Sequence, residues 1–193
     1  MGADPLAKAG QTLRVRAFFG LALPEEQRET LDTYLAACAA AAPDFRWTPA
    51  SNLHLTVRFI GNIEPSIAEG IGDRLVDRQP VGFELELGKV GTFRRGRLVR
   101  VVWLDVRSGG DAAADLAALL ELECTAAGLG PEARPFQPHL TLARTRARDG
   151  AMLPQLPEPP VLRPWRADEL ILYRSHLGRG GSIYEPLRRI RLS

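Results

Sequence analysis

Apolar residues recur along this chain with two different periods, and the periods predict its secondary structure. Short apolar or alternating segments predict β-strands over residues 15–21, 53–60, 83–87, 98–106, 137–143, 170–173 and 184–192. Apolar residues at helical spacing predict helices over residues 24–42, 65–79 and 111–127. Because the strands look amphipathic and are mixed with helices, we expect an α+β fold with antiparallel sheets rather than a doubly wound parallel sheet.

Prolines and glycines mark where these elements begin and end. Pro24 suits the first position of a helix, and Gly128 suits the end of one. Five prolines between residues 149 and 164 predict a loop. Residues 1–11 carry no periodic pattern, so we expect a flexible N-terminal tail followed by one domain over residues 12–193.

Length and charge narrow the class of protein. A chain of 193 residues can bury one sizeable core, or two small lobes that share one. The net charge is only +2, so any contact with RNA should be local. Lys8 and Lys89 are the only lysines among 25 basic residues. We attribute this excess of arginine to composition and keep individual arginines as candidates for binding phosphate.

The two cysteines, Cys38 and Cys124, lie in predicted helices and are expected to be small buried apolar residues. The sequence contains no cluster of Cys and His at metal-ligand spacing and no nucleotide-cofactor fingerprint, so we expect no metal and no cofactor. The N-terminus does not resemble a signal peptide, and no apolar stretch is long enough to span a membrane. We therefore expect a cytoplasmic protein.

The strongest indication of chemistry is a repeated sequence motif. Two of the three histidines begin nearly the same motif, His54-Leu55-Thr56 and His139-Leu140-Thr141. A random chain of this composition would contain such a pair roughly once in several thousand cases, so an internal duplication is the natural cause. The third histidine, His176, has no threonine partner and is expected to be structural or exposed.

Side chains alternate along a strand, so each motif presents its histidine and threonine on one face. If the side chains alternate strictly along the strand, Arg58 lies on the same face as His54 and Thr56. If two similar lobes face each other across a pseudo-twofold axis, both pairs converge in one central cleft. A neutral imidazole can then deprotonate water, a charged one can protonate a leaving oxygen, and the hydroxyls can bind phosphate oxygens.

Several further segments accompany the two motifs, and together they resemble one known family, the two-histidine (2H) phosphoesterases. Within it the chain is most similar to the RNA 2′,3′-cyclic phosphodiesterases, also called 2′-5′ RNA ligases. The segments that carry the resemblance are Arg16-Ala17-Phe18-Phe19, Arg46-Trp47, Asn52-Leu53-His54-Leu55-Thr56, Pro135 to Arg144, Leu172-Tyr173-Arg174-Ser175 and Gly180 to Leu187.

The resemblance implies a bilobal, duplicated fold whose antiparallel sheets face a central cleft, with pseudo-twofold symmetry. It also implies metal-independent hydrolysis of an RNA 2′,3′-cyclic phosphate end to a 2′-phosphomonoester. It implies His54 as proton donor, His139 as proton acceptor, and Thr56, Thr141 and Arg144 as substrate-binding residues. Strict alternation, however, puts Arg144 opposite His139, so this arginine reaches the cleft only if the strand bends or ends there.

Three alternatives remain open from the sequence. The same core could act on 2′-5′ linkages as a ligase or phosphodiesterase, it could bind RNA or a nucleotide without turning it over, or it could be purely structural. In the reading that we favour, the partner is an RNA or nucleotide with a 2′,3′-cyclic phosphate. We expect no membrane contact and no obligate protein partner, and we expect a monomer.

Overall fold

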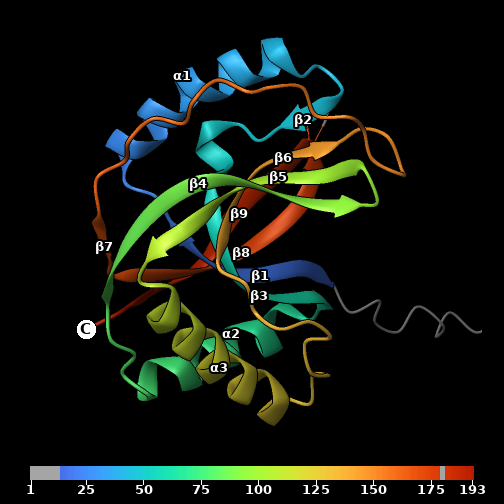
Figure 1. The fold of residues 1–193 in the computed structure, drawn as a ribbon. Coiled ribbons are helices and arrows are strands. Elements are labelled where there is room, and N and C mark those ends of the chain that lie inside the picture. Colours follow the sequence, from blue (N-terminus) through green and yellow to red (C-terminus); the bar gives the residue numbers. More distant parts are fainter. Residues whose placement is uncertain (1–13, 179–180) are drawn as a thin grey trace, which may run out of the picture.

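In the computed structural model, which describes residues 14–178 and 181–193, nine strands and three α-helices form the α+β fold predicted above (Figure 1). The predicted tail over residues 1–11 lies outside the described residues. The strands are β1 (Val15–Ala22), β2 (Phe45–Trp47), β3 (His54–Ile63), β4 (Phe83–Arg95), β5 (Leu98–Ser108), β6 (His139–Thr145), β7 (Trp165–Ala167), β8 (Glu169–Gly178) and β9 (Gly181–Arg191). The helices are α1 (Glu25–Ala41), α2 (Pro65–Asp77) and α3 (Gly110–Ala126), with a short 3₁₀ turn, η1 (Ala50–Asn52).

The sheet is antiparallel, and its strand order is symmetric about its centre. The order is β7-β4-β5-β6-β3-β1-β8-β9, with β2 paired beside β6. Reading outward from the middle, β3 corresponds to β6, β1 to β5, and β8 to β4. The two predicted halves are therefore present, but they are joined: β3 and β6 meet through one registered pair, Leu55 opposite Leu140.

The helices cross between the halves. Helix α1 follows β1 in the chain, yet it packs near η1 and β2, beside β6. Helix α3 follows β5, yet it packs against β3 and α2 at the opposite end of the molecule (Figure 1). Each half of the sheet thus buries its apolar face under a helix from the other half, in a core that includes both Cys38 and Cys124. Among the described residues, no helix is long and apolar enough to cross a membrane.

Each histidine strand contains a β-bulge directly after its threonine. Opposite β1, Gly20 pairs with Thr56 and Phe19 pairs with Arg58, which leaves Val57 as the extra residue. Opposite β5, Trp103 pairs with Thr141 and Val102 pairs with Ala143, which leaves Leu142 extra. A bulge places two consecutive side chains on one face and so reverses the alternation beyond it.

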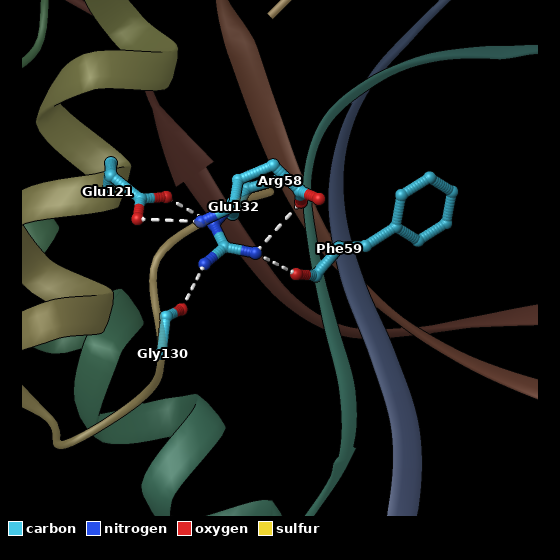
Figure 2. A network of polar contacts seen from close by, with 5 residues as sticks. All are labelled: Arg58, Phe59, Glu121, Gly130 and Glu132. Carbon is cyan, nitrogen blue, oxygen red and sulfur yellow. Dashed lines mark hydrogen bonds and ion pairs between the residues drawn. The ribbon is translucent and has the colours of Figure 1, made fainter. Parts of the chain in front are cut away.

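The bulge in β3 overturns the prediction that Arg58 shares a face with His54 and Thr56. Arg58 is buried on the opposite face and has a relative exposure of 8%. Its guanidinium donates to Glu121 Oε2 at 2.6 Å and Glu132 Oε2 at 3.0 Å, and to the carbonyl oxygens of Phe59 and Gly130. Figure 2 shows Arg58 and Phe59 pointing away from each other on either side of β3. Arg58 therefore ties β3 to α3 and to the segment that leads into β6.

The bulge in β6 has the opposite effect on an arginine. It moves Arg144, which strict alternation had placed opposite His139, to the face of His139. Ala143 is buried in the core, while Arg144 emerges on the face that carries His139 and Thr141. Counted from the histidines, Arg144 is the fifth residue after His139, as Phe59 is the fifth after His54. The two β-bulges therefore place an arginine on the cleft face in one half of the sheet and a phenyl ring on that face in the other half.

We predict that Arg58→Met lowers the free energy of unfolding by about 2–3 kcal/mol, because two carboxylates and two carbonyls lose their donor. The estimate is discounted for Glu121 and Glu132, whose side chains are 29% and 44% exposed. Urea denaturation of the purified variant measures the change.

The matched control is Arg95→Met, which removes an ion pair to Asp149 in which the two side chains are 70% and 69% exposed. That pair should contribute less than about 0.5 kcal/mol. Equal, small changes in the two variants would contradict a stabilising role for the Arg58 network.

Candidate active site

His54 and His139 are the first residues of neighbouring antiparallel strands. Each directly precedes one of the two leucines that join β3 to β6, Leu55 and Leu140. Because side chains alternate, both leucines enter the core and both imidazoles project from the other face. The structure thus brings the two motifs together at the centre of the sheet.

The two imidazoles are held in the same way. Nδ1 of His54 lies 2.8 Å from the carbonyl oxygen of Asn52, and Nδ1 of His139 lies 2.7 Å from that of Gln137. A carbonyl oxygen only accepts, so each Nδ1 carries the hydrogen and donates it. In the neutral ring Nε2 is then a free base, and in the charged ring it is an acid. Each histidine is therefore oriented to exchange one proton through Nε2.

Aromatic side chains surround both rings, more densely at His54. The rings of Phe18, Tyr184 and Tyr173 lie 4.7, 5.0 and 5.9 Å from the His54 ring, centroid to centroid. Gly20 permits this packing, since a Cβ there would lie 3.2 Å from Cδ2 of His54. The two adjacent phenylalanines of β1 point to opposite faces: Phe18 contacts His54, and Phe19 is fully buried in the core.

His139 has its own aromatic neighbours from the other half of the sheet. Phe93 meets its ring edge-on at 5.1 Å, and Trp103 lies at 6.0 Å. The indole of Trp103 covers Gly91 so closely that a Cβ there would lie 2.3 Å from the ring. Phe93, Trp103, Tyr173 and Tyr184 were not predicted as site residues, because their approach depends on pairing between strands distant in sequence.

The surroundings of the histidines disfavour their charged forms. Burial lowers the pKa of His54 to about 4, although the Asn52 carbonyl opposes the shift, and the charges of Arg144 and His139 lower it further. Burial also lowers the pKa of His139, which the Gln137 carbonyl opposes and Arg144 reinforces. The free site is therefore short of negative charge, and a bound anion would raise the pKa of both imidazoles.

Thr56 and Thr141 lie two residues beyond their histidines, before the bulges, and both are half-buried on the cleft face. Within the part of the chain that the structure describes, neither hydroxyl is hydrogen-bonded to another protein group, so both remain available to a ligand. Trp47 and Trp165 have structural roles. Trp165 is buried in the core, and Nε1 of Trp47 donates to the carbonyl oxygen of Ala42.

Comparison with known proteins identifies the family. The family model described as the 2′-5′ RNA ligase superfamily matches residues 23–179. The chain belongs to this superfamily. Superfamily members named RNA 2′,3′-cyclic phosphodiesterase include a protein of Escherichia coli K12, 33% identical over 90% of this chain and 94% of its own. Another, from Methanothermobacter thermautotrophicus, is 31% identical over 93% of this chain and its entire length.

Solved structures agree with this assignment to the superfamily. E. coli LigT complexed with 3′-AMP superimposes with a TM-score of 0.78 and 31% identity, covering 94% of this chain and 99% of its own. The TT0787 protein of Thermus thermophilus superimposes with a TM-score of 0.76 and 28% identity, covering 92% of this chain and 97% of its own. The duplicated α+β fold is therefore that of the superfamily.

We predict that Arg144→Gln raises the pKa of both His54 and His139, because it removes a cation that disfavours the imidazolium form of each. Titration of the ring carbon-bound protons by NMR measures both values in one sample, and His176 serves as an internal reference. If the pKa of His54 and His139 stayed unchanged while the protein remained folded, the Arg144 guanidinium could not face the two rings.

Proposed function

We propose that this chain hydrolyses the 2′,3′-cyclic phosphate end of an RNA to a 2′-phosphomonoester. The observation that carries the proposal is the pair of imidazoles, each fixed through Nδ1 to the carbonyl two residues before it, with Nε2 left free. The relatives named RNA 2′,3′-cyclic phosphodiesterase, and the LigT structures holding 3′-AMP and phosphate, support this choice of substrate.

In the proposed reaction the two histidines perform one proton transfer each. Nε2 of His139 takes a proton from water while the water oxygen attacks phosphorus. The bond between phosphorus and O3′ breaks, and Nε2–H of His54 delivers its proton to O3′. Thr56 and Thr141 donate hydrogen bonds to the non-bridging oxygens, and Arg144 offsets their negative charge. Each turnover leaves His139 charged and His54 neutral, and proton exchange with water restores the starting state.

Because the pKa values of the histidines are lowered, protonation of the general acid depends on substrate binding. A histidine with a pKa of about 4 is neutral in the free protein at neutral pH and cannot act as an acid. A cyclic phosphate monoanion between the rings raises the pKa of the nearby imidazole, so binding and proton uptake are coupled. The acid is therefore formed chiefly when substrate is present.

We further propose that one copy of the chain suffices, since both histidines and both threonines come from the same sheet. The thiols of Cys38 and Cys124 are free and buried, which is consistent with a reducing compartment such as the cytoplasm. Sedimentation of the active protein tests the proposed monomer.

We predict a bell-shaped pH dependence of kcat/KM on a nucleoside 2′,3′-cyclic phosphate, with its maximum below about pH 6.5. Catalysis needs one charged and one neutral histidine, and the pKa of both lies below the usual histidine value of about 6.5 in the free protein. Above the maximum, kcat/KM should fall about tenfold per pH unit. The profile of kcat should peak at higher pH, because it reports the complex with the phosphate anion. A kcat/KM maximum above about pH 7.5 would contradict this account.

The roles of the two histidines can be separated with a substrate whose 3′ bridging oxygen is replaced by sulfur. A thiolate leaves without a proton, so it does not need a general acid. On the oxygen substrate, His54→Ala and His139→Ala should each lower kcat by about 10²- to 10⁴-fold. On the sulfur substrate, only His139→Ala should retain a loss of that size. The reverse pattern would exchange the two roles, and full activity of either variant on the oxygen substrate would end the proposal.

Product analysis on 2′-5′ linked oligonucleotides distinguishes the remaining reactions of the superfamily. Turnover of such linkages at a higher kcat/KM than the cyclic phosphate would replace the proposed substrate with the 2′-5′ diester. Addition of a chelator tests metal independence, and we expect unchanged rates.

A further inference from the structure

One apolar side chain on the cleft face is exposed without an evident structural reason. Phe59 has a relative exposure of 47%, although it follows the buried Arg58. The bulge in β3 turns it toward the face of His54, and Figure 2 shows its ring projecting from the side of the strand opposite Arg58. Its ring centroid lies 5.8 Å from that of Phe18, which lies 4.7 Å from that of His54. A row of three rings therefore leads from His54 out to solvent.

A cation accompanies this exposed ring. Arg16 lies two residues before Phe18 on β1, so the two side chains share the cleft face, and Arg16 is exposed. Across the strands Phe18 pairs with Phe59, and Arg16 pairs with Asn62, so Arg16 and Phe59 lie on the same face of two neighbouring strands. Within residues 14–178 and 181–193, the Arg16 guanidinium forms no ion pair and no side-chain hydrogen bond.

The charge of Arg16 also reaches the catalytic cleft. Burial lowers the pKa of Arg144, and the charge of Arg16 lowers it further, so the two cations lie close enough to repel each other. Neither forms an ion pair among the described residues. Two neighbouring cations on the face that carries the histidines suit a ligand that carries more than one phosphate.

We propose that Phe59 and Arg16 form a second nucleotide subsite, which binds the nucleotide preceding the cyclic phosphate end of an RNA. The base of that nucleotide stacks on Phe59, and Arg16 binds the phosphodiester that links it to the terminal nucleotide. Stacking on a phenyl ring tolerates any base, so the subsite recognises RNA without reading its sequence. The inference rests on the proposed function and adds to it a binding site for the nucleotide that precedes the cyclic phosphate.

The test compares kcat/KM on a nucleoside 2′,3′-cyclic phosphate with that on a tetranucleotide ending in the same group. The unchanged protein should prefer the tetranucleotide by about tenfold or more, since one stacked base is worth about that factor. Phe59→Ala should remove most of this preference and change mononucleotide turnover less than about twofold. Phe59→Trp, which keeps an aromatic face, should retain the preference.

Arg16 is tested through charge. Arg16→Gln should lower kcat/KM on the tetranucleotide by about 5- to 20-fold and reduce the slope of its salt dependence by about one. With the unchanged protein, replacing the last internucleotide linkage of the tetranucleotide by an uncharged methylphosphonate should lower kcat/KM by the same factor. With Arg16→Gln, the same replacement should cause no further loss of kcat/KM. The matched controls are Val76→Ala, at a side chain 44% exposed on α2, and Arg191→Gln, at the exposed end of β9. Neither control should alter the preference.

Different failures have different signatures. If Phe59→Ala and Arg16→Gln lowered turnover of the mononucleotide and the tetranucleotide equally, these residues would contact the terminal nucleotide, and the second subsite would be overturned. The same conclusion would follow if neither variant changed the preference. Absence of turnover on both substrates by the unchanged protein would instead remove the proposed function. Mononucleotide turnover in each variant also reports that it is folded.

Discussion

The pairing of Leu55 with Leu140 is the contact on which the catalytic geometry depends. It is the registered pair between β3 and β6, and it joins two halves that otherwise pair with their own strands. Each leucine is buried, and each directly follows a histidine. Burial of the two leucines therefore fixes the strand register, and the register places the two imidazoles side by side on the opposite face. A slip of one residue would turn either histidine into the core.

The symmetry of this arrangement is broken by the residues that pair with each motif. Gly20 lies opposite Thr56, where the other half has Trp103 opposite Thr141. Ala22 lies opposite His54, where the other half has Asp105 opposite His139. The tethers from Nδ1 to a backbone carbonyl are nearly identical, so they cannot give the rings different roles. The two rings therefore differ in their neighbours and not in how they are tethered.

The cleft as a whole is prepared for an anion. Aromatic rings and burial depress the pKa of His54, and Arg144 adds a positive charge that disfavours protonation of both histidines. A bound phosphate group would offset that charge, and the same change would raise the pKa of both imidazoles. From the other face of the sheet, the Arg58 network holds Gly130 and Glu132 in the segment that leads into β6 (Figure 2).

The local pattern of the sequence was sufficient to predict the helices, the loop over residues 149–164 and the two histidine strands. It predicted only residues 83–87 of β4 (Phe83–Arg95) and 170–173 of β8 (Glu169–Gly178). It missed β2 and β7, because three residues are too few to show a period. It also predicted that the leucines of both motifs face the core, because the alternation of side chains depends on the strand alone. The positions of Arg58, Phe59 and Arg144 could not follow from alternation, because a bulge is defined only against a partner strand. Tertiary pairing therefore decided which arginine enters the cleft and which is buried behind it.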